Sequence, residues 1–290
     1  MEIRKAERRK AKLRLGITGP AGSGKTYGAL QIAFGLGGKI VLIDTENGSG
    51  DLYANLGEYD VCPLEAPYTV QKYIEAIKTC ERYGYDVIII DSLSHAWAGE
   101  GGLLEMHSKL TESSKSGNSY TAWGKVTPLH NQLIDAMLRS KSHVIATMRS
   151  KTEYVMVENE RGRSEPRKVG LAPVQRDGME YEFGTVFDLS MNHLATVSKD
   201  RTQIFDGQVF ALSQQTGEAL KEWLNTGRDY EAFRTRVKEL YSAYLEKYGQ
   251  DAEQAKQAML QITGGKLSQE WTDGDLHALE DSLNPTEAAG

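Results

Sequence analysis

The sequence has few cysteines, no long apolar run and no excess of positive charge. Cys62 and Cys80 are the only cysteines among 290 residues, and two thiols without partnered histidines cannot complete a tetrahedral metal shell. No signal peptide and no apolar run of membrane-spanning length is present in the sequence. These features predict a cytoplasmic protein in a reducing compartment, with no membrane partner and no cysteine-based metal site.

The formal net charge of −6 excludes a protein coated in basic surface, so contact with nucleic acid has to come from local patches. One such patch is the basic N-terminal segment 1–12, and the second lies between Arg149 and Arg176. A solvated, frayed helix is an equally good interpretation of the first patch.

Apolar runs of strand length alternate with helical patterns in the first half of the chain. Residues 13–18 lead into a glycine-rich turn, and residues 25–36 follow helical spacing. KIVLID (39–44) and DVIIID (86–91) are continuous apolar runs, with the amphipathic stretch 69–82 between them. Unbroken Val/Ile/Leu runs that alternate with helices predict a mostly parallel sheet that is buried on both faces.

The pattern changes in the second half. A helix over about 128–139 and a strand over 142–148 precede two runs, 151–158 and 167–171, which flank the turn-like NERGRS and predict a β-hairpin. Short antiparallel strands are expected at 186–190, 193–198 and 203–205, and helices at 230–248, 251–262 and 273–283. The predicted fold is therefore α/β, with a basic segment 1–12, a core over 13–212 with a hairpin extension, and a small α-helical C-terminal domain over 213–290.

GPAGSGKT, residues 19–26, fits the phosphate-loop pattern G-x-x-x-x-G-K-[ST] and lies between a predicted strand and a predicted helix. In such a loop glycines let backbone N–H groups turn toward phosphates, Lys25 reaches the β and γ phosphates, and the Thr26 hydroxyl binds magnesium. The predicted ligands are ATP and Mg²⁺. The predicted nucleotide contacts are Gly19, Pro20, Ala21, Gly22, Ser23, Gly24, Lys25, Thr26, Tyr27 and Thr147.

Two acidic residues follow predicted strands. Asp91 ends the run VIIID, so its carboxylate is expected beside the phosphate loop, where it would hold magnesium together with Thr26. Glu46 closes the strand after the first helix and is expected opposite the γ-phosphate, where it would orient and deprotonate the attacking water.

At these residues the chain resembles a known family. VLIDTENGSGDLYANLG is similar to the strand and loop that carry the catalytic glutamate of RecA-type recombinases, and DVIIIDSLSHAW is similar to their second acidic strand. KVGLAPVQRDGMEYEFGTVFDL and HLATVSKDR resemble later strands of phage-encoded RecA-like P-loop ATPases, the AAA-type group that includes single-strand annealing proteins. The resemblance covers about Leu13 to Leu212, and it implies a RecA-like core in a protein of the phage-infected bacterial cytoplasm.

The resemblance also implies roles for basic residues. Lys199 and Arg201 are similar to the Lys-x-Arg element by which RecA-like ATPases reach a neighbour's active site, which implies a homo-oligomer, either ring or filament. The hairpin region follows the strand that leads to the DNA loop in that family, and the polar stretch 108–123 falls where the other DNA loop lies. The residues expected to bind single-stranded DNA are Arg149, Lys151, Arg161, Arg163, Arg167, Lys168 and Arg176. A plain solvated hairpin is the alternative for this region, and a charged turn for Lys199 and Arg201.

The predicted function is that of an ATP-dependent recombination protein, with DNA-stimulated ATPase activity, that binds single-stranded DNA as an oligomer and promotes annealing or strand pairing. A single-strand-binding protein is a further candidate partner, through the C-terminal domain. The chain departs from bacterial RecA where Thr147-Met148-Arg149 replaces the Asn-Gln sensor, so annealing is favoured over full strand exchange. A RecA-like helicase or motor and a protein-directed regulatory ATPase are the alternatives. A small-molecule phosphotransferase fits less well, because it would have no use for Glu46 or Arg201.

Overall fold

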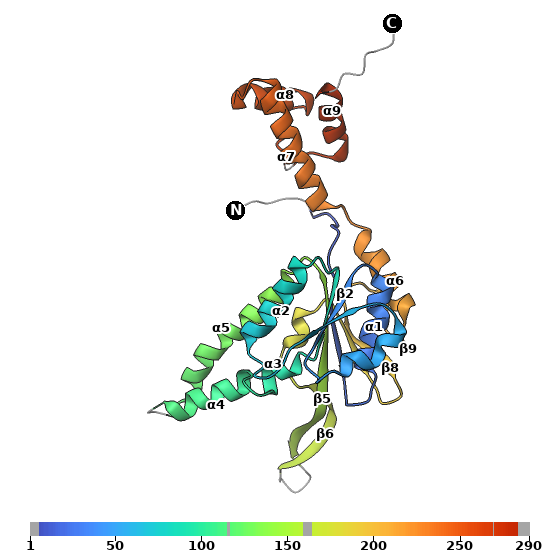
Figure 1. Cartoon of the computed structure of the whole chain (residues 1–290), viewed down its shortest axis with the longest axis vertical. Coiled ribbons are helices and arrows are strands. Elements are labelled where there is room, and N and C mark those ends of the chain that lie inside the picture. Colours follow the sequence, from blue (N-terminus) through green and yellow to red (C-terminus); the bar gives the residue numbers. More distant parts are fainter. Residues whose placement is uncertain (1–5, 115–116, 159–163, 269, 284–290) are drawn as a thin grey trace. The chain divides into compact units, whose positions relative to one another are not determined.

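A computed structural model describes residues 6–114, 117–158, 164–268 and 270–283, without the side chains of 152–171. The chain divides into two compact units, residues 11–224 and residues 1–10 with 225–290. The larger unit is built around one sheet, which Figure 1 shows with helices on both sides. In its described residues the smaller unit contains helices α7 (Tyr230–Lys247), α8 (Ala252–Ile262) and α9 (Asp273–Leu283), around a core of its own.

The sheet has the strand order β3-β2-β4-β5-β1-β7-β8-β9, with β6 paired to β5. The six strands from β3 to β7 along this order pair in parallel, whereas β8, β9 and the β5–β6 hairpin pair antiparallel. The strands are β1 (Arg14–Gly19), β2 (Ile40–Asp44), β3 (Asp60–Pro63), β4 (Val87–Asp91), β5 (His143–Glu158), β6 (Ser164–Pro173), β7 (Thr185–Leu189), β8 (Leu194–Asp200) and β9 (Val209–Ala211). The predicted fold class, mixed α/β with a mostly parallel sheet, is confirmed.

Two apolar cores cover the two faces of the sheet. Helices α1 (Lys25–Leu36) and α6 (Gln214–Asn225) pack on one face, and α2 (Val70–Arg82), α3 (Ser94–Ala98), α4 (Leu103–Ser113) and α5 (Ser119–Leu138) on the other. Every residue of β2 and β4 is buried, as expected for strands covered on both sides. The 3₁₀ helices η1 (Ser49–Leu56) and η2 (Met179–Glu182) lie in the connections.

Helix α6 belongs to the larger unit, so the division falls after Leu224 rather than at the predicted residue 212. The physical reason is close packing between α6 and α1. Leu220 and Leu224 of α6 are buried in the core that α1 also covers. Gly35 of α1 and Gly217 of α6 lie so close that a Cβ on either would clash with the other helix. The basic segment also divides differently from the prediction, because residues 6–10 belong to the smaller unit. There the backbone of Arg9 forms an isolated parallel β-bridge with that of Arg228.

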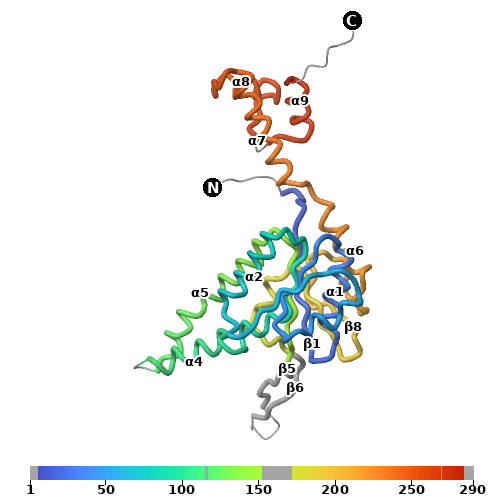
Figure 2. The backbone as a smooth tube through the Cα atoms, in the orientation of Figure 1, coloured from blue at the N-terminus to red at the C-terminus, as the bar shows by residue number. Residues whose placement is uncertain are grey.

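Two further expectations are corrected. The stretch 108–123 is largely helical rather than a loop, since α4 extends to Ser113 and α5 begins at Ser119. Figure 2 shows this pair of helices extending away from the sheet. The strand expected at 203–205 lies instead at Val209–Ala211, because Phe205 turns into the core and contacts Phe187 edge to face. None of the helices in the described ranges is long and apolar enough to cross a membrane.

Candidate nucleotide-binding and active site

The phosphate loop joins β1 to α1 at the carboxyl edge of the parallel strands, where open α/β sheets bind ligands. Gly22 and Gly24 have φ angles of 78° and 89°, in the left-handed region that glycine enters without steric cost. The first turn of α1 contains no acidic side chain, so the positive end of its dipole faces the loop unopposed. The loop therefore has the backbone geometry of an anion-binding site.

Lys25 turns back over the loop. Its Nζ donates to the carbonyl oxygens of Gly19 at 3.0 Å and Pro20 at 2.8 Å. Burial lowers the pKa of this ammonium group, and the nearby carboxylates of Asp91 and Glu46 oppose that shift. The ammonium group is thus held between the loop backbone and the two acidic residues that the sequence singled out.

The Asp91 carboxylate accepts hydrogen bonds from hydroxyl groups on two other elements. Thr26 Oγ1 donates to Asp91 Oδ2 and Thr147 Oγ1 donates to Asp91 Oδ1, each at 2.5 Å. Asp91 is only 2% exposed, and burial raises the pKa of its carboxyl group against the effect of the two hydroxyls. Thr147, predicted as a nucleotide contact, therefore lies behind Asp91 and fixes its orientation.

The oxygen ligands present suit magnesium bound to a triphosphate. Hydroxyl and carboxylate oxygens are hard ligands of the kind that Mg²⁺ takes from proteins, usually one or two of them beside the phosphates. Among the described residues no group of three or more His, Cys, Asp and Glu side chains could hold a metal ion by itself. Thr26 and Asp91 therefore fit a magnesium ion that arrives with ATP, rather than one held by the protein alone.

Glu46 lies in a loop that Asp44 shapes. Asp44 Oδ1 accepts a hydrogen bond from the Glu46 amide at 2.6 Å, and Oδ2 accepts one from the Gly50 amide at 3.1 Å. Because Asp44 is the register partner of Asp91, Glu46 lies just beyond the edge of the sheet beside the proposed magnesium ligands.

Arg149 holds the carboxylate of Glu46 at both oxygens. Its Nε donates to Oε1 at 3.0 Å and its Nη2 donates to Oε2, a bidentate ion pair. Burial, the largest single influence, raises the pKa of Glu46, but the hydrogen bond and charge of Arg149, helped by His95, lower it overall. The sequence interpretation assigned Arg149 to DNA binding; in the structure its guanidinium pairs with Glu46, and its residue lies opposite Gly19 in the register of β1 and β5.

His95 is a member of the site that the sequence did not single out. Its Nδ1 lies 2.8 Å from Thr45 Oγ1, and its ring stacks on Tyr68 with centroids 4.8 Å apart. Burial lowers the pKa of His95, and the charge of Arg149 lowers it further. The only sequence signal was its position shortly after the second acidic strand, which also suits an ordinary core histidine.

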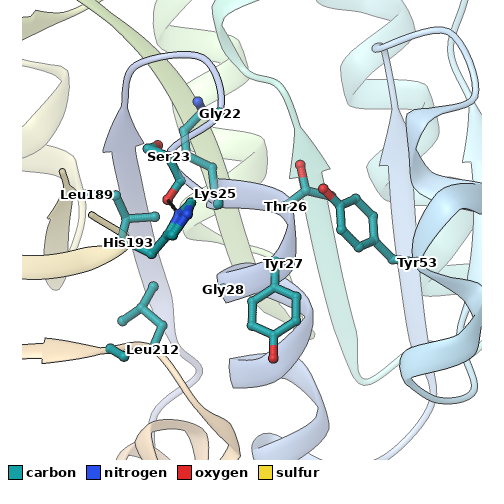
Figure 3. Close-up of a pocket in the computed structure, with 12 residues that line it drawn as sticks. Gly22, Ser23, Lys25, Thr26, Tyr27, Gly28, Tyr53, Leu189, His193 and Leu212 are labelled. Atoms are coloured by element: carbon teal, nitrogen blue, oxygen red, sulfur yellow. Dashed lines mark hydrogen bonds between the residues drawn. The ribbon is translucent and has the colours of Figure 1, made fainter. Parts of the chain in front are cut away.

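A cavity of about 460 Å³ opens beside the phosphate loop. Tyr27, Tyr53, His193 and Leu212 line it together with the loop residues, as Figure 3 shows. His193 Nδ1 lies 3.1 Å from the Ser23 carbonyl oxygen, marked by the dashed line. Aromatic rings beside a phosphate loop offer a flat apolar surface to a nucleobase. Tyr53, His193 and Leu212 come from segments outside the loop in sequence, so the phosphate-loop pattern does not reach them.

Lys199 and Arg201 lie away from the phosphate loop. Asp200, between them, pairs with Thr185, and Thr185 pairs with Leu15 near the start of β1. The loop follows the other end of β1, about 13 Å along the strand. Lys199 Nζ donates to the carbonyl oxygens of Glu180 at 3.2 Å and Tyr181 at 2.6 Å, whereas Arg201 is exposed. Neither group can act on its own nucleotide, so a catalytic role requires a neighbouring subunit.

The residues expected to contact DNA are only partly described. Lys151 is exposed on β5, just beyond the nucleotide site. Arg176 is half-buried, with its guanidinium 5.9 Å from the centroid of the Trp123 ring. Arg161 and Arg163 lie outside the described residues, as do the side chains of Arg167 and Lys168.

A family model described as an AAA domain matches residues 11–229 of the chain. Comparison with curated proteins gave no match. The matched residues include the phosphate loop, both acidic strands, the β5–β6 hairpin and α6.

Proposed function

The chain belongs to the AAA domain family of P-loop ATPases, and from that premise we propose that it is a DNA-recombination ATPase. In this proposal it binds single-stranded DNA as an oligomer, hydrolyses ATP, and promotes annealing or strand pairing. The family accounts for nucleotide binding and hydrolysis, and the arrangement around β5 supports the link to DNA.

Each residue of the site has a role in the proposed hydrolysis. Lys25 and the loop amides would bind the β and γ phosphates, and Thr26 with Asp91 would hold magnesium, which neutralises phosphate charge. Glu46 would accept the proton of the attacking water. Tyr53 and Tyr27 would contact the base, and Thr147 would keep the Asp91 carboxylate oriented.

The observation that supports the DNA part of the proposal is the course of β5. This strand carries Thr147, which is bonded to Asp91, then Arg149, which is paired with Glu46, and then Lys151 in the hairpin with β6. Strand β5 thus passes from the nucleotide site into a segment rich in basic residues. Basic side chains along such a segment bind phosphates in a salt-dependent way.

The exposed Arg201, far from its own nucleotide, supports an oligomer in which a neighbour's cation completes the site. The C-terminal helical unit remains the candidate surface for a single-strand-binding protein. The alternative favoured by the family itself is a nucleotide-hydrolysing motor.

The experiment is steady-state ATP hydrolysis with and without single-stranded DNA across a salt series. The wild type is expected to hydrolyse ATP faster when single-stranded DNA is present. In the double variant Lys151→Ala, Arg176→Ala, this stimulation should weaken, and the slope of log DNA affinity against log salt concentration should decrease by about 0.7 for each phosphate contact removed. Lys141→Ala, an exposed lysine before β5, is the matched control. Hydrolysis without any DNA effect would move the proposal to a protein-directed ATPase, and directional unwinding would move it to a helicase.

A further inference from the structure

The ion pair between Arg149 and Glu46 joins two groups whose charges an ATPase would use separately. Glu46 is the group proposed to accept a proton from water. A carboxylate that accepts hydrogen bonds from a guanidinium at both oxygens is a weak proton acceptor, since protonation would break that pairing. The paired arrangement is therefore a resting form of the site rather than the hydrolysing form.

The backbone of Arg149 is anchored, whereas its side chain is partly exposed. Its amide donates to Ser94 Oγ at 2.9 Å, and its carbonyl oxygen accepts from the Val174 amide at 2.6 Å. The side chain is 47% exposed, compared with 24% for Glu46. A guanidinium on a fixed backbone beside Gly19 can therefore exchange one oxyanion for another without any change in the fold.

The charges of the site favour such an exchange when a triphosphate enters. The cations of Lys25 and Arg149 lie close to the anions of Glu46 and Asp91, and the charges of the other three groups all act on the pKa of Lys25. ATP with one magnesium ion adds net negative charge at the loop. A guanidinium fork matches a phosphate as well as a carboxylate, and a terminal phosphate carries more charge. The γ-phosphate is thus a stronger partner for Arg149 than Glu46 is.

We propose that Arg149 is a catalytic residue of its own subunit. When ATP binds, Arg149 breaks its ion pair with Glu46 and binds the γ-phosphate instead, and Glu46 is then released to act on water. The inference rests on the proposed ATPase function and deepens it. No covalent bond changes in the exchange; one bidentate ion pair replaces another. ADP lacks the γ-phosphate and leaves the Arg149–Glu46 pair intact, so this arginine makes the site distinguish ATP from ADP.

The test compares Mg²⁺-dependent binding of ADP and of a non-hydrolysable ATP analogue, together with ATP turnover. In Arg149→Ala, affinity for the analogue should fall about 10–100-fold, as for loss of a charge-assisted pair, while affinity for ADP stays within about twofold. Turnover should fall about 10²–10³-fold, since arginines on the transferred phosphoryl group have effects of this order or larger. Arg149→Lys, which keeps the charge but not the fork, should give intermediate values.

Arg139→Ala is the matched control, because Arg139 is an exposed arginine that also pairs with a carboxylate, Asp135, at 3.7 Å. It should change neither affinity nor turnover. Glu46→Gln should raise affinity for the analogue and leave that for ADP unaltered, because it frees Arg149 in advance.

Faster turnover in Arg149→Ala would show that the arginine only restrains Glu46, and would overturn the inference. An unchanged ratio of ADP to analogue affinity would overturn it as well. Wild-type hydrolysis together with an unaffected Arg149→Ala would refute this inference alone. A wild-type chain that binds neither nucleotide would refute the proposed function, and this inference with it.

Discussion

Replacing Asp91 with asparagine should make the nucleotide-free protein more stable while removing its response to Mg-ATP. The carboxylate is buried, and no cation among the described residues lies in hydrogen-bonding contact with it; it accepts hydrogen bonds from Thr26 and Thr147. Burying a charge in such a place has a net cost of about 1–2 kcal/mol after the hydroxyl hydrogen bonds are counted. For a unit of this size 1 kcal/mol shifts Tm by about 2–4 °C, so Asp91→Asn should melt about 2–8 °C higher.

Mg-ATP should reverse this order of stability. At 100 times Kd a ligand stabilises the folded state by about 2.7 kcal/mol, which raises the Tm of the wild type by about 5–11 °C. Asp91→Asn should show little of this gain, because an amide is a poor magnesium ligand. The pH dependence has a defined sign. Burial raises the pKa of Asp91, so the nucleotide-free wild type should lose stability as pH rises through the folded-state pKa, and Asp91→Asn should lack that loss.

Differential scanning calorimetry with and without Mg-ATP measures both effects. Asp60→Asn is the control, since Asp60 is an exposed carboxylate at the start of β3 that accepts a hydrogen bond from the Tyr85 hydroxyl. A lower Tm for nucleotide-free Asp91→Asn would show that the carboxylate is a structural acceptor. An undiminished Mg-ATP shift in that variant would refute its role as a metal ligand.

Two other predictions concern catalysis. Glu46→Gln should still bind ATP but release phosphate about 10²–10⁴-fold more slowly; unchanged phosphate release in a coupled assay would remove Glu46 from the reaction. Arg201→Ala and Glu46→Gln should each be inactive alone yet recover part of the activity when mixed, because some interfaces then combine an intact Glu46 with an intact Arg201. Mixtures with no more activity than the sum of the parts would argue against a cation supplied by a neighbour.

The local parts of the fold could be predicted from sequence, because they depend on periodicity and on short motifs. The buried strands β2 and β4 and the helices α1, α2 and α9 lie within a residue or so of the expected ranges. The phosphate loop could be predicted because its glycines and Lys25 lie within eight consecutive residues. Asp91 was anticipated because a carboxylate at the end of a buried strand has few other uses beside such a loop.

The parts that depend on which segments meet in space could not be predicted. In the sequence, Arg149 is the first basic residue of the predicted hairpin region. Its place beside Gly19 and Glu46 depends on the register of β5 against β1, which the sequence does not reveal. His193 and Leu212 reach the cavity from β-structure far along the chain. Helix α6 looks like the start of a helical tail by composition, and only the close approach of Gly217 to Gly35 shows that it completes the core.

The most direct test of the central claim is an equilibrium titration of ATP into the wild type and into Lys25→Ala, with and without magnesium. The account predicts magnesium-dependent binding to the wild type, and a loss of about 10-fold or more in Lys25→Ala, since its ammonium group is the cation placed on the loop itself. Equal, magnesium-independent affinity of the two proteins for ATP would contradict the assignment of the nucleotide site.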